Sequence, residues 1–477
     1  MSLAARLRAA ATPAAADPEV PARPAVLAGV LRDSPLWLVA VAVVYMLTEL
    51  SPMLLHMPLG PDEITYIAQT SVQHSAVMLP PVHSRGPALL AAPVTLLTSS
   101  LLTLRIWMAL LSGIGLLLAM LCWRGVRRDW VIATAGLILS SLGIAELSGV
   151  QAMPDWWVAL GAIAVIGLFL RAVSGQLRPA LALPLLGFAT FFLFLQRMQD
   201  AVFLIAPLML AIVLVPAWRN IKVLTAIFAG AAAAVAEWVG ESYAFYGGVL
   251  SRLHMMKQEP PKLAIYFTLP YQLRVLNGPW YCKPHQCHQW DYRWMTIWWV
   301  ALVALAVAGV LAARRTARLN SSLVVLASAV SLLLAYTLFV PYATPRYLLP
   351  VIALLIIPAA DGIFWLPGAV ARRWRALAIA GIVAFLLGGM YGEHLVKTKM
   401  ASGQDITRAD FTLKASLAQA AGVGPPCVDA SPSIAYYLGC SAPYTGQATL
   451  EILMTHGGVG AWRQVSGLLT PVFVPQS

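Results

Sequence analysis

Two adjacent carboxylates provide the first chemical signal in the sequence. Asp62 and Glu63 follow Pro58 and Pro61, just after the first long apolar segment. A carboxylate can act as a general base toward the proton of an acceptor group, or it can orient that group. Acids in the first turn of a helix are also stabilised by the helix dipole, so the same residues are typical of an ordinary helix start. The pair alone leaves both interpretations open.

A third carboxylate lies at the start of a later apolar segment. Asp155 follows Met153 and Pro154, where an aspartate is also common as a helix-capping residue. If Asp62 and Asp155 face one cavity, they could share a divalent metal ion, or they could divide the base and orienting roles between them. These residues do not decide between a metal site and a metal-free site.

Three arginines interrupt apolar stretches near the same predicted membrane face, namely Arg85, Arg197 and Arg346. The planar guanidinium group pairs with phosphate through two parallel hydrogen bonds. The alternative is that each side chain extends toward lipid headgroups. Arginines are usually depleted from the outer face of a membrane protein, so three of them there favour a phosphate-binding role.

Another pair of acids is spaced for one helix face. Glu237 and Glu241 are four residues apart, so they could line the same cavity or simply solvate a helix end. Further candidates for lining that cavity stand close to the acids and arginines in the sequence; they are Tyr66, His83 and Tyr347.

The composition shows what kind of scaffold must hold these residues. Of 477 residues, 60% are hydrophobic and only 11% are charged, whereas soluble domains carry roughly 25% charged residues. The sequence therefore predicts an all-α, polytopic membrane protein. The formal charge is +12, but the basic residues form small clusters between apolar runs, which indicates membrane orientation and not nucleic-acid binding.

About eleven apolar runs are long enough to cross a membrane as helices. The expected spans are about 35–55, 105–123, 130–148, 155–171, 180–195, 200–217, 221–240, 294–312, 321–340, 347–366 and 376–391. A further run, 87–103, is interrupted by Pro87 and Pro93. If it lies in the interface, every short arginine-rich connection falls on one side, so we predict an interfacial helix there.

This topology divides the chain into three parts. We expect a disordered cytoplasmic tail over 1–33, a transmembrane catalytic domain over 34–392, and a small α/β extracytoplasmic domain over 393–477. The long outer loops would be 56–104 and 241–293. The candidate site residues then all lie at the outer face of the membrane, with the N-terminus in the cytoplasm.

The cysteines test that orientation. Cys122 lies at an inner end and is expected to be a free thiol, while Cys282 with Cys287 and Cys427 with Cys440 form two local pairs in outer regions. Disulfides persist outside the cytoplasm, so we predict two disulfides. The alternative for the first pair is a metal site that includes neighbouring histidines, but its spacing matches no standard zinc pattern.

The ordered set of motifs resembles the GT-C fold glycosyltransferases, which include aminoarabinose transferases and protein O-mannosyltransferases. The resemblance covers about residues 35–370. It rests on Asp62-Glu63-Ile64-Thr65-Tyr66, Arg85-Gly86-Pro87-Ala88-Leu89-Leu90, Leu104-Arg105-Ile106, Met153-Pro154-Asp155, Gly187-Phe188 with Arg197, and Pro345-Arg346-Tyr347-Leu348-Leu349-Pro350. At the outer turn, this chain has Gln196-Arg197 where aminoarabinose transferases carry lysine, so the donor sugar does not transfer with the resemblance.

The resemblance implies an inverting glycosyltransferase of a bacterial inner membrane, with Asp62 as the leading catalytic carboxylate. It implies a polyprenyl-phosphate-linked sugar donor, a hexose or pentose, whose phosphate is neutralised by Arg85, Arg197 and Arg346. The acceptor would be a lipid, a glycan or a protein. The competing hypotheses are a transporter or flippase of a lipid-linked or anionic substrate, which would place its charges near the bilayer midplane, and a membrane scaffold.

Overall fold

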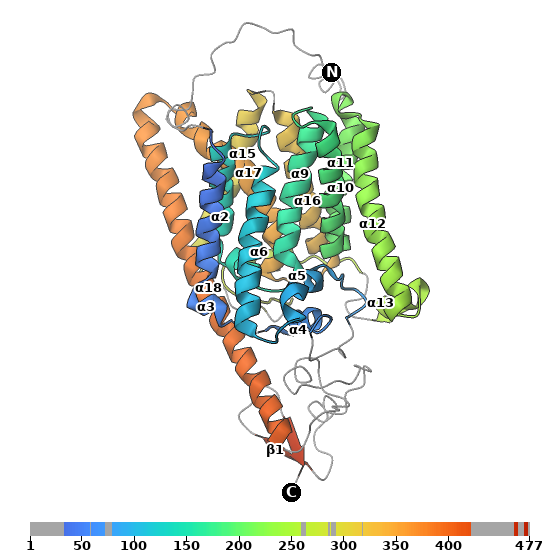
Figure 1. The fold of residues 1–477 in the computed structure, drawn as a ribbon. Coiled ribbons are helices and arrows are strands. Elements are labelled where there is room, and N and C mark those ends of the chain that lie inside the picture. The colour runs from blue at the N-terminus through green and yellow to red at the C-terminus, as the bar shows by residue number, and fades with distance from the viewer. Residues whose placement is uncertain are drawn as a thin grey trace.

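The structure is a computed structural model that describes the chain in nine segments. They are residues 33–57, 59–71, 79–258, 264–284, 287, 292–316, 318–420, 462–465 and 472–475, with side chains described as far as residue 401 in the last long helix. Most of the described residues lie in helices, and the long helices run side by side as one bundle (Figure 1).

Eight helices of the described chain are long and apolar enough to cross a membrane, so the protein is polytopic. They are α6 (Leu101–Leu121), α9 (Pro154–Val173), α10 (Pro179–Gln196), α12 (Ile221–Phe245), α15 (Met295–Arg314), α16 (Leu319–Phe339), α17 (Pro345–Ala369) and the first part of α18 (Arg375–Ala420). A ninth span results if the bent pair α7 (Asp129–Ser140) and α8 (Gly143–Gly149), which meet at 81°, is taken as one crossing.

The expected count of eleven spans is not confirmed. Helices do occupy the two remaining positions, as α2 (Leu36–Glu49) and α11 (Met198–Leu214), but both are shorter than eighteen residues. The run predicted to be interfacial forms a separate short helix, α5 (Gly86–Thr95), which ends before α6 begins. It follows α3 (Pro52–Leu55) and α4 (Pro61–Ile67), and all three lie at the lower end of the bundle in Figure 1.

Helices α9 and α17 form the centre of the bundle, and about four-fifths of each apolar span is buried inside the protein. Small residues allow α17 to approach its neighbour closely: a Cβ atom on Gly309 of α15 would lie 1.8 Å from the carbonyl oxygen of Pro358. Close backbone contact of this kind is how membrane helices gain packing energy without a hydrophobic driving force. Helix α17, which begins at Pro345, is therefore packed closely against α15.

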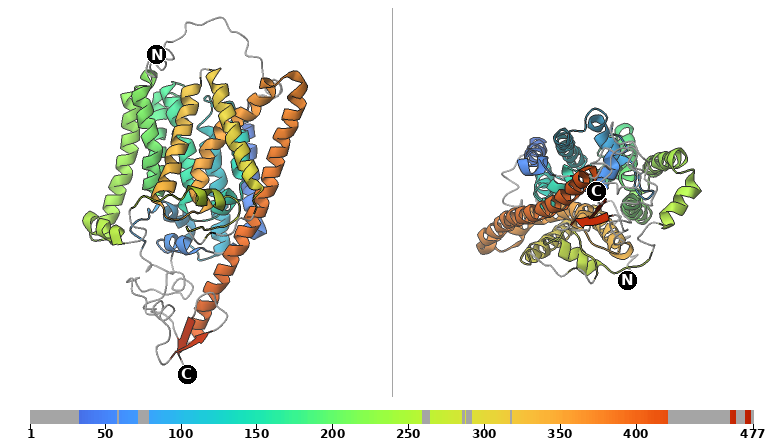
Figure 2. Two further views of the ribbon diagram at one scale, coloured as in Figure 1. Left: turned by 180° about the vertical axis from the view of Figure 1, so that it is seen from behind. Right: turned by 90° about the horizontal axis from the view of Figure 1, so that it is seen from below.

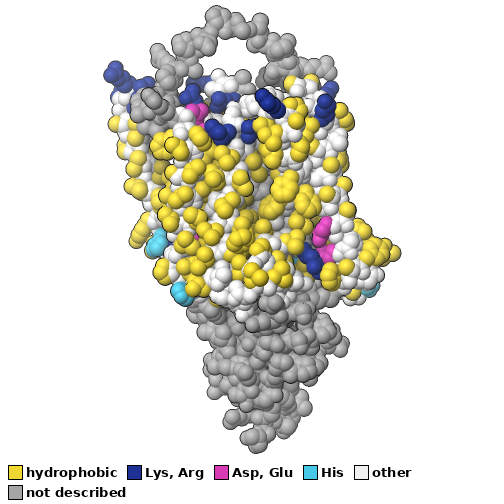
Figure 3. All heavy atoms as spheres, in the orientation of Figure 1, with side chains coloured by type: hydrophobic (Ala, Val, Ile, Leu, Met, Phe, Trp, Pro, Cys, Tyr) yellow, Lys and Arg dark blue, Asp and Glu magenta, His cyan; other side chains and the backbone are white. Residues whose placement is uncertain are grey.

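The two ends of the bundle differ in charge. Most of the visible Lys and Arg side chains gather at the upper end in Figure 3, which we term the arginine-rich end. There, Arg127 is buried and binds the Asp361 carboxylate at 2.7 Å and the Ser322 hydroxyl at 3.0 Å. The opposite end carries α3, α4, α5 and α13 (Val249–Gln258), and we term it the site end (Figure 1).

The long helix α18 flanks the bundle on the side opposite to α12 (Figures 1 and 2). It continues without a break through residue 393, where the sequence analysis places a domain boundary. Beyond it, the described chain holds an antiparallel pair, β1 (Trp462–Val465) and β2 (Val472–Pro475). The expected disulfide between Cys427 and Cys440 lies outside the described residues, and the small α/β domain stays a prediction.

Candidate functional site

Four parts of the chain bring charged side chains together at the site end. Asp155 lies in the first turn of α9, Arg346 in the first turn of α17, and Arg197 at the junction of α10 and α11. Asp62 lies in the first turn of α4. Because α9 and α17 begin with Pro154 and Pro345, whose fixed backbone angle suits the first helical position, the two charged residues that follow are firmly placed.

Arg346 links the two aspartates that the sequence analysis singled out. Its Nη2 donates to Asp62 Oδ2 at 2.7 Å, and its Nε lies 3.9 Å from Asp155 Oδ2. The side chain of Asp155 is only 1% exposed, whereas that of Asp62 is 48% exposed. Burial raises the pKa of the Asp62 carboxyl, but the Arg346 guanidinium outweighs it and holds that pKa below its ordinary value. Asp62 is therefore an ionised carboxylate that substrate can reach.

Arg197 ties Asp155 to two residues of the neighbouring helices. Its guanidinium donates to Asp155 Oδ1 at 3.0 Å, to Asp200 Oδ2 at 3.4 Å and to the Tyr336 hydroxyl at 3.1 Å. Tyr336 in turn donates a short hydrogen bond to Asp200 Oδ2. Asp155 and Asp200 each keep one buried oxygen, and Arg346 keeps its Nε, without a hydrogen-bond partner in the described part of the chain. Buried polar atoms of this kind are candidates to bind a substrate.

Tyr347 covers the two arginines. Its ring stacks on Tyr336 with centroids 5.0 Å apart, and the guanidinium carbons of Arg197 and Arg346 lie 5.3 and 5.6 Å from its centroid. Its hydroxyl is 2.9 Å from that of Tyr342. Cations over an aromatic face are attracted by the ring quadrupole. The tyrosine therefore helps to hold both guanidinium groups in place.

Glu63 does not face this cluster, although it is adjacent to Asp62. Its carboxylate is 1% exposed and accepts two hydrogen bonds from Arg105, at 2.5 and 2.9 Å, and one from the backbone of Ala152 at 2.8 Å. Arg105 is fully buried and also donates to the carbonyls of Met57 and Val150. The pair connects α4, α6 and the turn before Asp155, which favours a positioning role for Glu63, and the reacting role expected from the sequence stays a prediction.

His83 and Tyr66 pack together beside the cluster. Their rings are 5.2 Å apart, Tyr66 is buried, and the Nδ1 of His83 is a buried atom with no hydrogen-bond partner among the described residues. Burial lowers the pKa of the His83 imidazole to about 4, although the nearby Asp62 opposes the shift. His83 is therefore neutral at pH 7, and burial raises the pKa of the Tyr66 hydroxyl, so neither adds charge to the site.

Arg85 belongs to a second group of charges, built on α12 and α13. Its Nε donates to Glu241 Oε1 at 2.6 Å, and the other Glu241 oxygen accepts from the fully buried Arg252 at 2.9 Å. Arg252 also donates to the carbonyl oxygens of Pro81 and His83. Glu237, expected beside Glu241, is partly exposed and has no ion pair in the described chain. The structure therefore does not join Arg85 and these glutamates to the Arg346 cluster by any described bond.

A loop that carries the predicted disulfide fixes the segment before Arg346. The Cys282–Cys287 disulfide is confirmed, and the backbone of Cys282 exchanges two hydrogen bonds, at 2.9 and 2.8 Å, with Ala343. Earlier in the same loop, the backbone NH of Thr268 donates to the carbonyl oxygen of Thr337 at 3.0 Å. We term residues 264–284 together with Cys287 the strap. It holds both Tyr336 and Arg346 from the chain segments next to them.

The guanidinium group of Arg346 stands where a metal ion shared by Asp62 and Asp155 was expected. Arg346 lies between Asp62 and Asp155 and binds both. Within the described chain, no group of three or more His, Cys, Asp or Glu side chains is placed to hold a metal ion.

Comparison with solved structures identifies the fold. The structure is similar to the crystal structure of ArnT from Cupriavidus metallidurans bound to undecaprenyl phosphate, with a TM-score of 0.58, 13% sequence identity, and coverage of 93% of this chain and 98% of that one. The chain has a GT-C fold. The apo form of the same ArnT matches with a TM-score of 0.55 at 13% identity, over 85% of this chain and 84% of that one.

Other comparisons add little to this GT-C assignment. The archaeal oligosaccharyltransferase AglB from Archaeoglobus fulgidus, solved with an inhibitory peptide and a dolichol-phosphate, reaches a TM-score of 0.46 at 13% identity, over 80% of this chain and 58% of that one. No protein-family model and no curated protein matches the sequence. The GT-C resemblance predicted from the motif order is confirmed as a likeness of fold.

Within the GT-C fold, the sequence analysis missed three residues of the site. Asp200 lies three residues after Arg197, a spacing that places both on one side of the α10–α11 junction. Tyr336 had a weaker signal, as a polar group near the end of an apolar helix. Arg105 was noted only as part of a motif, and nothing in its sequence context reveals that it pairs with Glu63.

Proposed function

We propose that the protein is an inverting glycosyltransferase that moves a sugar from a polyprenyl-phosphate-linked donor to a hydroxyl acceptor. The observation that carries the proposal is the bridge of Arg346 between the accessible Asp62 and the buried Asp155 in a GT-C fold. One accessible carboxylate beside two guanidinium groups matches a reaction that needs a base at one end and an anion-stabilising group at the other.

The proposed chemistry uses each group at a stated atom. Asp62 accepts the proton of the acceptor hydroxyl while the acceptor oxygen forms a bond to the anomeric carbon. The bond from that carbon to the donor phosphate oxygen breaks, and the electron pair leaves with the phosphate. Arg346 and Arg197 then stabilise the charge that develops on the leaving group, as preorganised donors do in a site with little water. Attack from the face opposite the phosphate gives inversion.

The free site has to rearrange when donor binds. Three carboxyl groups, Asp62, Asp155 and Asp200, face two guanidinium groups, so both arginines already have acidic partners before any phosphate arrives. Phosphate is a bidentate partner for arginine and competes with Asp62 for Arg346. Donor binding then releases Asp62 from its ion pair, and the freed carboxylate becomes a stronger base at the moment when the acceptor needs one.

The proposed location is the outer face of a bacterial inner membrane. The connections between helices at the arginine-rich end carry most of the visible basic side chains, and such connections usually face the cytoplasm. The site end would then face outward, and the disulfide in the strap suits an oxidising compartment. The acceptor proposed is a lipid, glycan or protein outside the cytoplasm, and the donor sugar is a hexose or pentose.

The position of the cluster favours an enzyme over a transporter. Asp155, Arg346 and Arg197 lie at the termini of α9, α17 and α10. A transporter is expected to bind its substrate near the bilayer midplane, where access alternates between the two sides. Charges at helix termini instead suit a reaction at one membrane surface.

The test is release of polyprenyl phosphate by the purified protein from a panel of polyprenyl-phosphate sugars. Asp62→Asn should lower the rate by about 10²–10⁴-fold, the range that a positioned base contributes. The matched control is Asp361→Asn, which also converts a paired aspartate to an amide but lies in the Arg127 ion pair at the arginine-rich end. If Asp62→Asn turns over as fast as the wild type, the assignment of the base is wrong. If no donor of the panel is consumed but a lipid-linked sugar crosses proteoliposome membranes, the protein is a transporter.

A further inference from the structure

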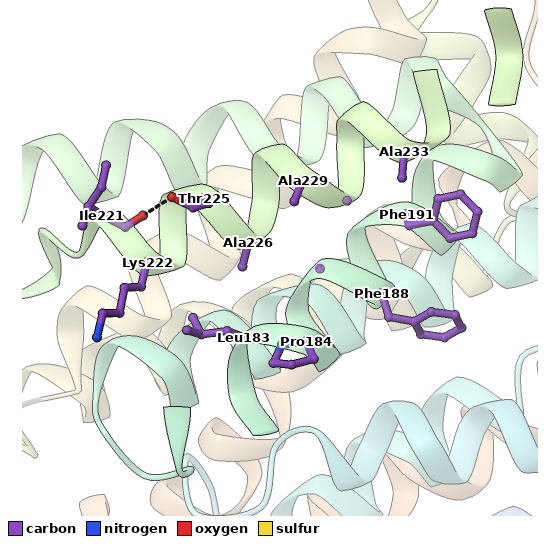
Figure 4. Close-up of a pocket in the computed structure, with 12 residues that line it drawn as sticks. Leu183, Pro184, Phe188, Phe191, Ile221, Lys222, Thr225, Ala226, Ala229 and Ala233 are labelled. Atoms are coloured by element: carbon purple, nitrogen blue, oxygen red, sulfur yellow. Dashed lines mark hydrogen bonds between the residues drawn. The ribbon is translucent and has the colours of Figure 1, made fainter. Parts of the chain in front are cut away.

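An apolar groove runs between α10 and α12, away from the charged cluster. Its volume is about 620 Å³. Phe188 and Phe191 of α10 form one wall, and Ala226, Ala229 and Ala233 form a row on α12 that faces them (Figure 4). The side chain of Phe188 is 64% exposed, so the groove opens toward the lipid.

Small residues create this groove. At the crossing of the two helices, a Cβ atom on Gly230 would lie 2.2 Å from the carbonyl oxygen of Gly187, so no larger residue fits there. The helix backbones touch at this point, and the alanines beside it leave a hollow that larger side chains would fill. Small residues at a helix contact are typical of membrane proteins, and the open hollow beside this contact is apolar, as a lipid chain is.

One end of the groove carries a positive charge. Lys222 stands in the first turn of α12, at the end of the alanine row and near Leu183 (Figure 4). From Lys222 to Ala233 the helix rises about 17 Å, at 1.5 Å per residue. One leaflet contributes about 15 Å of hydrocarbon, half of a typical bilayer core. The groove therefore has the length of one acyl chain, with a cation at the depth of the headgroup.

We propose that this groove binds one acyl chain of an anionic phospholipid from the leaflet at the arginine-rich end, with the lipid phosphate at Lys222. The lipid is distinct from the sugar donor. Along α12, Lys222 lies roughly 28 Å from Glu241, so a phosphate at Lys222 lies at the end of the bundle opposite to the site end (Figure 1). The site does not depend on the proposed transferase activity.

The test uses native mass spectrometry of the full chain in detergent, with dioleoylphosphatidylglycerol or dioleoylphosphatidylcholine added. Lys222→Gln should weaken binding of the anionic dioleoylphosphatidylglycerol about fivefold, the effect of one basic residue near a membrane surface. Ala229→Phe, which fills the groove, should reduce binding of both lipids. The control for charge is Arg219→Gln, whose side chain is exposed and donates to the Val213 carbonyl. The control for bulk is Ala232→Phe, at an exposed position outside the groove lining.

Three results would overturn the proposal. One is a bound-lipid count that Ala229→Phe leaves unchanged. Another is an equal effect of Lys222→Gln on both lipids. The third is displacement of dioleoylphosphatidylglycerol from the wild-type protein by a polyprenyl monophosphate, which would make the groove a site for the donor lipid. The Asp62→Asn variant should bind dioleoylphosphatidylglycerol as the wild type does. Failure of the proposed transferase function is therefore separable from failure of this site.

Discussion

Removal of the Glu63 carboxylate should destabilise the protein without touching the reacting atoms. Glu63→Gln keeps the shape of the side chain but leaves the fully buried Arg105 guanidinium without its counter-ion. Breaking a buried, hydrogen-bonded ion pair on one side costs about 3–5 kcal/mol. The backbone bond from Ala152 to Glu63 weakens as well, because a neutral amide oxygen is a poorer acceptor than a carboxylate.

The assay is thermal unfolding in detergent, read from tryptophan fluorescence, together with donor turnover at a temperature where every variant is folded. Glu63→Gln and Arg105→Met should each lower Tm, by on the order of 5 °C or more. The double variant should regain part of that loss, since it removes both buried charges. Asp62→Asn should lower turnover by about 10²–10⁴-fold and leave Tm unchanged. If Glu63→Gln keeps the wild-type Tm and loses turnover as Asp62→Asn does, Glu63 takes part in the reaction and the positioning role is refuted.

The remaining predictions concern the pH profile, Asp200 and the strap. Because Arg346 lowers the pKa of Asp62 against the effect of burial, the carboxylate stays ionised as the pH falls. The acid limb of the pH profile of kcat/KM should therefore lie below the range of an ordinary aspartate and move to higher pH in Arg346→Gln. An acid limb that does not move in this variant would show that another group titrates. Tyr336→Phe removes the hydroxyl that donates a hydrogen bond to the buried Asp200 and accepts one from Arg197. The change should lower the free energy of unfolding by about 1–3 kcal/mol and raise the KM for the sugar donor. An unchanged KM would show that Asp200 does not affect binding of the sugar donor. Replacing both Cys282 and Cys287 by serine should loosen the Ala343 segment and raise the donor KM more than it lowers kcat, and a pure loss of kcat would place the effect elsewhere.

The membrane architecture was predictable because the hydropathy of a segment indicates whether it can cross a membrane, and the placement of arginines indicates which connections share one side. The apolar runs predicted helices, and the positive-inside tendency predicted an interfacial helix in the run 87–103, where the short helix α5 forms over Gly86–Thr95. The break between α7 and α8 was missed, since the apolar run is continuous through Ser140 and Gly143 while the helix bends by 81°. The extension of α18 through residue 393 was missed because polarity rises there and Gly388, Gly389 and Gly392, which disfavour a helix, lie just before it.

The site was predictable at helix termini and much less so between distant segments. Asp155, Arg197 and Arg346 stand at helix ends of one membrane face, so topology alone brought them near one another. The partner of each charge depends on packing that no local pattern encodes. Glu63 and Asp62 are neighbours in sequence, yet successive residues of a helix point about 100° apart, and one faces Arg105 while the other faces Arg346.

Helix α18 is much longer than a membrane crossing requires. Its 46 residues give a rod of roughly 69 Å, more than twice the hydrocarbon thickness of a bilayer. The part of α18 beyond residue 401 accounts for roughly 28 Å of that rise. Removing seven residues would shorten the helix by about 10 Å and rotate its end by only about 20°. Spacing and direction at this end of the protein are thus tunable separately.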